Sequence, residues 1–129
     1  MKKVIVMASA TIIALFAFTL YSAFYGNPIS EYMMKQDTGG YLIGKGYKEE
    51  DILSIKPTYN SKRNTDRVKG TISYVVFADE PKEKYVYIQW RASGEIQQHC
   101  EYYDEDLNTY RTEFTEERKH METNCTIKY

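Results

Sequence analysis

Residues 4–24 read VIVMASATIIALFAFTLYSAF, a run in which no side chain carries a charge. At about 1.5 Å of rise per residue, a helix over this run would be about 31 Å long, and the hydrocarbon core of a bilayer is about 30 Å thick. The few serine and threonine hydroxyls in the run can bond back to helix carbonyls. The run therefore predicts a transmembrane anchor within residues 1–25 that contacts the lipid bilayer through residues 4–24.

A cleaved secretory signal is the rival interpretation, because Lys2 and Lys3 supply the positive start that both kinds of segment need. The apolar run is longer than the apolar centre of a signal, which usually has about 7 to 15 residues. Tyr21 also precedes Ala23 at a place where cleavage needs a small residue. These features favour an uncleaved anchor, and a buried helix of a soluble protein is the third alternative.

Basic residues set the expected orientation of the anchor. Lys2 and Lys3 precede the run, and the first basic residue after it is Lys35. The positive-inside rule then places the N-terminus in the cytoplasm and residues 26–129 outside the cell membrane, as one extracytoplasmic domain. That domain has a net charge of about −3, so nucleic acid is not an expected partner.

Two cysteines, Cys100 and Cys125, lie in the expected outside domain, where an oxidising compartment permits a disulfide. If paired, they close a loop of about 25 residues and stabilise the fold by about 3 kcal/mol in the chain-entropy model. Two separate thiols are the alternative.

A second helix is predicted from Ile29 to Lys45. Asn27 is a plausible N-cap, and Pro28 suits the first turn because its missing N–H costs nothing there. Glycines at 39 and 40 predict a kink or close packing, and those at 44 and 46 end the helix. One face of this helix is predicted to carry Ile29, Tyr32, Met33, Gln36 and Ile43, with Leu42 beside it.

Alternating apolar and polar residues predict strands at residues 53–59, 68–78, 84–90 and 96–103. Pro57 restricts the first of them to an edge or an irregular position. Short turns between the strands predict an antiparallel meander of three to four strands with the helix covering one face. The expected fold class is α+β.

Residues 104–129 form an acidic tail in which three- and four-residue spacings predict a C-terminal helix over residues 106–122. The last residues, 124–129, are candidates for a short strand.

Metal and catalytic chemistry find little support. The pair His99 and Cys100, with His120 and Cys125, matches none of the zinc spacings, and adjacent strand residues point to opposite faces. The chain has no nucleophile elbow, phosphate loop or H-E-x-x-H helix. We therefore expect no catalytic residue, no metal and no cofactor.

Tyrosine is abundant, with 13 residues in the chain. Aromatic side chains with one polar end are enriched at interfaces, so Tyr85, Tyr87, Trp90 and Tyr102 are candidates for an exposed interface. The alternative is that these rings form the core of a small sheet.

Basic residues gather between Lys56 and Lys69, and acidic residues gather between Glu101 and Glu122. The two segments could attract each other within the fold. Alternatively, the basic loop meets anionic lipid or a cell-wall polymer.

The stretch 24–52, FYGNPISEYMMKQDTGGYLIGKGYKEEDI, resembles a family of small, uncharacterised, single-span membrane proteins of Bacillus-type Gram-positive bacteria. Its members look like a span, a YGNP break, a helix, a G-Y-x-x-x-D-I junction and a few strands. The chain departs from that pattern at residues 37–40, and the tail beyond Tyr103 looks like an addition. The resemblance implies topology and source but no activity. The residues that carry it are Tyr25, Gly26, Asn27, Pro28, Gly46, Tyr47 and Asp51.

Together these patterns predict a noncatalytic, membrane-anchored binding or regulatory module for an envelope protein or polymer. One alternative is a secreted effector or inhibitor released by cleavage near Ala23. The other is a small enzyme or metal-binding protein.

Overall fold

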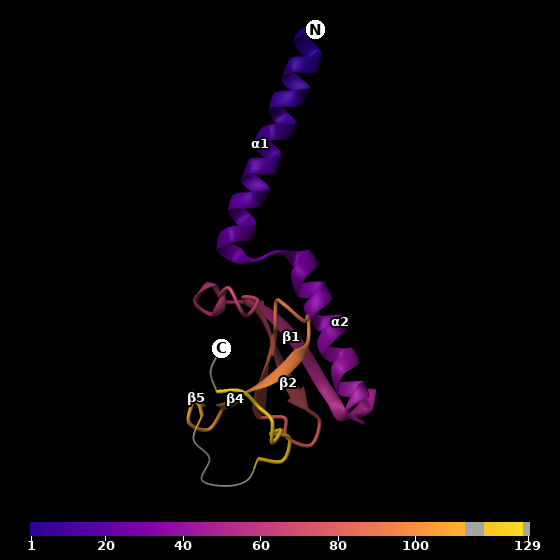
Figure 1. Cartoon of the computed structure of the whole chain (residues 1–129), viewed down its shortest axis with the longest axis vertical. Coiled ribbons are helices and arrows are strands. Elements are labelled where there is room, and N and C mark those ends of the chain that lie inside the picture. Colours follow the sequence, from indigo (N-terminus) through magenta and orange to yellow (C-terminus); the bar gives the residue numbers. More distant parts are fainter. Residues whose placement is uncertain (113–117, 128–129) are drawn as a thin grey trace.

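The computed structural model describes residues 1–112 and 118–127. Figure 1 shows helix α1 projecting from one end of a domain that is built from helix α2 and a sheet. Single 3-10 turns, η1 (Glu49–Asp51) and η2 (Ser61–Arg63), flank the first strand. The helices and strands are α1 (Lys2–Tyr25), α2 (Pro28–Gly44), β1 (Ile52–Tyr59), β2 (Thr71–Phe77), β3 (Glu83–Gln89), β4 (Ile96–Asp104) and β5 (Thr109–Arg111).

Most of helix α1 projects away from the domain, which it touches only at its C-terminal end, and none of its residues is buried. Thr11 and Thr19 donate to the carbonyl oxygens four and three residues earlier, at 2.9 and 2.7 Å. Within the described residues, α1 is the one helix long and apolar enough to cross a membrane, and an N-terminal signal sequence meets the same criteria.

Helix α2 starts as the sequence predicts. Asn27 Oδ1 accepts from the N–H of Ile29 at 2.9 Å, and Pro28 occupies the first turn. The helix runs without interruption through Gly39 and Gly40. The predicted N-cap at Asn27 and the predicted place of Pro28 in the first turn of α2 are both confirmed.

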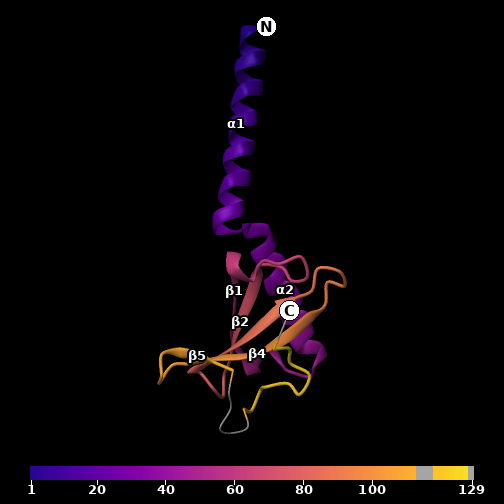
Figure 2. The same ribbon diagram turned by 60° about the vertical axis from the view of Figure 1, so that its left-hand side comes forward.

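The strands form one antiparallel sheet in the order β1-β2-β3-β4-β5, so each strand pairs with its neighbours in sequence. The predicted α+β class is confirmed, and β5 is an addition to the expected strands. Pro57 lies in β1, an edge strand as predicted. The turns after β1 and β3 lie at the end of the domain next to α1 (Figures 1 and 2), which we call the junction end.

Helix α2 covers one face of the sheet through Met34, Thr38 and Leu42, its buried residues. Thr38 Oγ1 lies 2.8 Å from Ser73 Oγ of β2, and both residues are fully buried. The core on this face consists of Leu42, Val75, Phe77, Tyr85, Tyr87 and Tyr102. A smaller core on the opposite face consists of Val68, Ile72, Val86 and Ile88.

The apolar face predicted for α2 is not the face that packs on the sheet. A Cβ added to Gly39 would lie 3.6 Å from Ile55 of β1, and the small Thr38 reaches β2. Small residues that allow close approach therefore decide which side packs. Four large apolar residues of α2 stay exposed, and we call them the outer face of α2: Ile29 (62%), Tyr32 (65%), Met33 (54%) and Ile43 (47%).

The predicted C-terminal helix over residues 106–122 is wrong for its described part. Asp104 Oδ1 accepts from the N–H groups of Asp106 and Leu107, and the chain returns as β5. The rings of Tyr103 and Tyr110 then meet across the hairpin at 4.9 Å. Cross-strand aromatic pairing thus outweighs the helical spacing. Residues 113–117 of the predicted helix lie outside the described residues.

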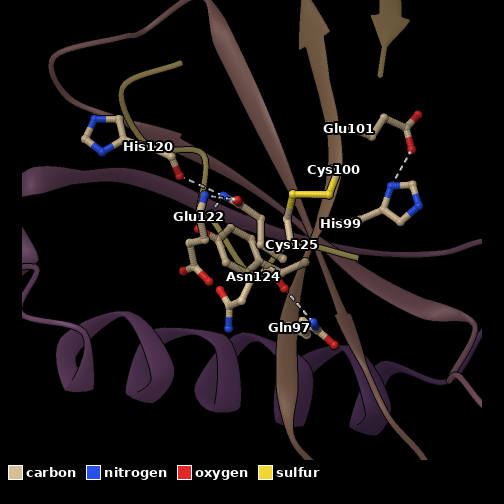
Figure 3. Close-up of a disulfide and its surroundings, with 10 residues drawn as sticks. Gln97, His99, Cys100, Glu101, His120, Glu122, Asn124 and Cys125 are labelled. Atoms are coloured by element: carbon tan, nitrogen blue, oxygen red, sulfur yellow. Dashed lines mark hydrogen bonds and ion pairs between the residues drawn. A yellow bond between two sulfur atoms is a disulfide. The ribbon is translucent and has the colours of Figure 1, made fainter. Parts of the chain in front are cut away.

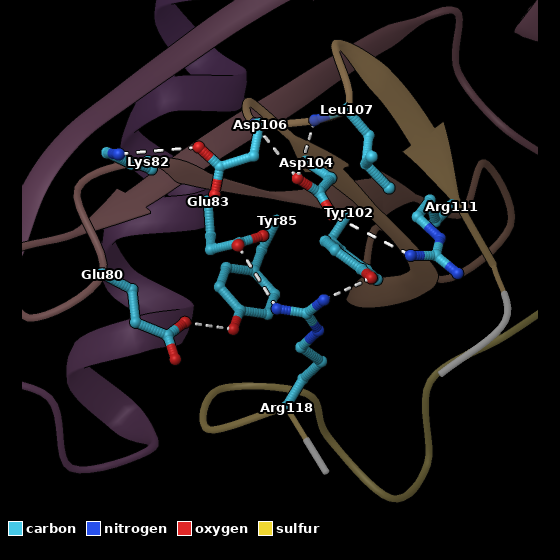
Figure 4. Close-up of polar contacts among 10 residues, drawn as sticks. All are labelled: Glu80, Lys82, Glu83, Tyr85, Tyr102, Asp104, Asp106, Leu107, Arg111 and Arg118. Carbon is cyan, nitrogen blue, oxygen red and sulfur yellow. Dashed lines mark hydrogen bonds and ion pairs between the residues drawn. The ribbon is translucent and has the colours of Figure 1, made fainter. Parts of the chain in front are cut away.

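Residues 118–126 pack irregularly against the sheet. Arg118 donates to Glu83 at 3.2 Å and to the hydroxyl of Tyr102 at 2.5 Å (Figure 4). The His120 ring stacks on Phe77, with 4.0 Å between centroids. The predicted strand at residues 124–129 is limited to a single bridge between His99 and Thr126 in its described part.

Asp79 holds the same segment from the β2–β3 turn. Its carboxylate lies 2.6 Å from Lys119 Nζ and 2.7 Å from His120 Nε2. The hydrogen bonds from Lys119 and His120 lower the pKa of Asp79 from 3.8 to about 2. Because the unfolded carboxyl titrates at its ordinary value, this contact stabilises the fold above about pH 4.

Candidate functional site

The break between α1 and α2 is a packed contact. Gly26 has φ of 87°, and a Cβ at this position would lie 2.5 Å from Tyr59 Cβ. The Tyr59 hydroxyl donates to the carbonyl oxygen of Ala23 at 3.4 Å. Glycine is required here both for its backbone conformation and for the close approach, so the end of β1 rests against the end of α1.

The G-Y-x-x-x-D-I junction, which contains Tyr47 and Asp51, forms the corner between α2 and β1. Tyr47 packs on Phe77 at 4.8 Å, and its hydroxyl lies 2.9 Å from His120 Nδ1. Asp51 accepts from the N–H of Lys48 at 2.8 Å and so closes η1. These motif residues position elements of the fold.

The loop between β1 and β2 carries the basic cluster and is fixed to the sheet. Arg63 donates to Glu101 of β4 at 2.6 Å, and His99 Nδ1 lies 3.2 Å from the same carboxylate oxygen. Burial alone would raise the pKa of Glu101, but hydrogen bonds from His99 and Arg63 hold it below its ordinary value. Arg63 of the basic loop thus pairs with Glu101 of the acidic segment, which agrees with the prediction that the two segments attract each other within the fold.

A cavity of about 580 Å³ lies at the junction end, between the end of α1, the start of α2 and the turns after β1 and β3. We call it the junction pocket. It has two basic lining residues, and no acidic residue is among its described lining. Its polar lining includes Ser22, Ser30, Asn64, Lys69, Gln89 and Arg91.

Hydrogen bonds hold the two cations of the junction pocket in place. Lys69 Nζ donates to Gln89 Oε1 at 2.9 Å. Arg91 donates from Nε to the carbonyl oxygen of Thr65 at 2.8 Å, and from Nη2 to Asn64. Both cations are therefore oriented by the loop and the sheet.

A second surface, the outer face of α2, borders a groove of about 460 Å³ between α2 and β1. Gly39 and Gly40 line its helical wall, and Leu53, which is 60% exposed, lines its strand wall. Met33 of the outer face also lines the junction pocket. The two surfaces are therefore adjacent along α2.

The predicted aromatic interface is placed mainly in the core. Tyr85, Tyr87 and Tyr102 are at most 1% exposed, and burial raises the pKa of Tyr85 and Tyr87. Trp90 is half-buried, and its indole N–H donates to Gln97 at 2.8 Å. The three tyrosine rings therefore belong to the core, and the exposed apolar surface of the domain lies on α2 instead.

Cys100 and Cys125 form a disulfide, with 5.1 Å between their Cα atoms (Figure 3). Beside it, Gln97 Nε2 donates to the carbonyl oxygen of Asn124 at 2.7 Å. The bond therefore ties the C-terminal segment to β4. Within the described residues, no group of three or more His, Cys, Asp and Glu side chains could hold a metal ion.

The sequence pointed to the basic loop but missed the junction pocket. Lys69 belongs to the recognised cluster, whereas Arg91 follows β3 and reaches the pocket only through strand pairing. Gly26 and Pro28 mark the break, but their spacing does not reveal that Tyr59 packs there.

A family model for DUF3139, a protein of unknown function, matches residues 1–87. The chain belongs to this family. No curated protein and no solved structure matches the chain. The DUF3139 match includes both helices and the first two strands and reaches Tyr87 of β3. Strand β4 and both cysteines lie beyond the matched residues.

Proposed function

We propose that this DUF3139 protein is a noncatalytic, membrane-anchored module outside the cytoplasm that binds another membrane protein through the outer face of α2. The exposure of Ile29, Tyr32, Met33 and Ile43 on one face of a helix carries the proposal. Burying an exposed side chain of this size contributes about 1 to 2 kcal/mol, so burial of all four against a partner would favour association.

The apolar length of α1 supports its role as the anchor, with Lys2 and Lys3 on the cytoplasmic side. The disulfide supports an oxidising compartment for the domain. The YGNP break supports an origin in the envelope of a Bacillus-type Gram-positive bacterium.

The position of the outer face favours a partner that is itself in the membrane. Ile29 is four residues beyond Tyr25, the last residue of α1, so the face starts at the membrane surface in this topology. A partner that contacts Ile29 must therefore reach the bilayer, as an integral membrane protein does.

Photo-crosslinking in native membranes tests the binding face. Tyr32→p-benzoylphenylalanine should give an adduct with a membrane protein, and Leu107→p-benzoylphenylalanine is the matched control because Leu107 is 57% exposed on the β4–β5 turn. Equal adducts at both positions, or none at either, would contradict the proposal. An adduct of twice the chain mass would replace the heterologous partner by a second copy.

Cysteine labelling in intact cells tests the topology. A membrane-impermeant maleimide should label Leu107→Cys and leave Lys3→Cys unlabelled, because only the domain is outside. Release by cleavage near Ala23 is the competing function, and an intact mass that includes residues 1–23 would exclude it.

A further inference from the structure

We propose that the junction pocket binds the phosphate-bearing headgroup of an anionic phospholipid. This inference rests on the proposed function, because it requires α1 to lie in a bilayer. The depth of the pocket, its charge and an unused hydrogen-bonding group all suit such a headgroup.

The depth of the pocket matches the boundary between acyl chains and headgroups. Its α1 wall runs from Phe18 to Ala23, about 8 Å along the helix. With residues 4–24 across the hydrocarbon core, this wall lies at the outer edge of that core. Phe18 then adjoins acyl chains, and the wall built by the domain faces the phosphate layer.

The charge of the pocket suits an anion. Lys69 and Arg91 lie on the domain wall, and no described lining residue is acidic. The N-terminus of α2 borders the same space through Asn27 and Ser30, and the partial positive charge of a helix N-terminus also favours an anion. Figures 1 and 2 both show the β1–β2 loop beside the end of α1.

The hydroxyl of Ser22 supplies an independent observation. The hydroxyls of Ser9, Thr11 and Thr19 each donate to a carbonyl oxygen of α1. Ser22 lines the junction pocket, and its half-buried side chain places Oγ out of reach of bulk water with no hydrogen-bond partner among the described residues. A phosphate oxygen in the pocket would accept the hydrogen bond that this hydroxyl offers.

Lipid selectivity of the full-length protein in vesicles measures the site. Spin-labelled phosphatidylglycerol and spin-labelled phosphatidylcholine are compared in bilayers of phosphatidylcholine. A basic residue close to an anionic headgroup contributes about fivefold in affinity, so we expect at least about a fivefold preference for phosphatidylglycerol. No preference in the wild-type protein would overturn the proposal.

Two variants with equal loss of charge separate the pocket from general surface attraction. Lys69→Gln with Arg91→Gln should reduce the preference below about twofold. Lys62→Gln with Arg67→Gln removes two exposed cations of the same loop that do not line the pocket, and should retain the preference. Equal loss in both variants would overturn the pocket in favour of diffuse attraction.

A third variant and two controls complete the test. Ser30→Phe fills the pocket without changing its charge and should also abolish the preference, with near-ultraviolet circular dichroism showing the folded domain. Displacement of the lipid by excess inorganic phosphate would overturn the lipid as ligand. Loss of the protein in an alkaline wash of the vesicles would overturn both anchor and pocket, whereas retention without lipid preference overturns the pocket alone.

Discussion

Removal of the disulfide should cause a large loss of stability. The bond joins Cys100 and Cys125, which are 25 residues apart. In the chain-entropy model, a loop of this length contributes about 3 kcal/mol at 25 °C. A domain of about 100 residues has an unfolding entropy of about 0.2 kcal/mol/K, so the melting temperature should fall by about 15 °C.

The assay is thermal unfolding of the full-length protein in detergent micelles. Near-ultraviolet circular dichroism follows the tyrosines and Trp90 of the domain, whereas the far-ultraviolet signal would include helix α1. Three samples are compared: the wild-type protein, the reduced wild-type protein, and Cys100→Ala with Cys125→Ala. Thr123→Ala, an exposed change in the same segment, is the control and should leave the melting temperature unchanged.

A fall of less than about 3 °C in both the reduced protein and the double variant would refute this reasoning. It would mean that contacts of Arg118 and His120 persist in the unfolded ensemble and keep residues 118–125 near the sheet. The disulfide would then remove little further entropy from the unfolded chain. A fall in the double variant alone would instead point to lost packing of the buried Cys100.

Three further changes test the fold around the candidate site, each by the same melting assay. Asp79→Asn should lower the melting temperature at pH 6. The difference from the wild type should shrink as pH falls from about 4 toward 2, because the pKa of Asp79 is lower in the folded protein than in the unfolded chain. A constant difference across this range would contradict the pairing of Asp79 with Lys119 and His120. Gly70→Ala should destabilise the fold by about 1 to 3 kcal/mol because the added methyl would lie 2.7 Å from the side chain of Asn64. Gly40→Ala, which has no described neighbour within 4 Å, should instead stabilise α2. Equal effects of the two changes would refute this packing argument. Thr38→Val should cost about 1 to 3 kcal/mol by leaving a buried hydroxyl of β2 without its bond, and an unchanged melting temperature would show that α2 does not depend on it.

Local signals in the sequence were sufficient for both helices and the first four strands. Asn27 and Pro28 determine the start of α2 through cap chemistry, which needs only neighbouring residues. Pro57 identifies an edge strand because proline lacks the N–H that a central strand requires. Alternation of side chains likewise placed the four longer strands within a few residues of their bounds.

Features that depend on contacts between distant segments were not predictable from spacing. Apolar periodicity selected the wrong side of α2, because the side that packs is decided by the fit of Thr38 against Ser73. The three- and four-residue spacings that follow the acidic run 104–106 suggested a helix, whereas pairing of Tyr103 with Tyr110 makes a hairpin. The junction pocket needs three segments brought together by the sheet, so no single stretch of sequence signals it.

The order of strands in the sheet has a consequence for how the chain folds during synthesis. Since β1 to β5 lie side by side in the order in which they are made, each new strand finds its partner already present. No strand has to wait for a segment from the far end of the chain. Cys125 follows all five strands in the chain, so the disulfide can form only after every strand of the sheet has been synthesised.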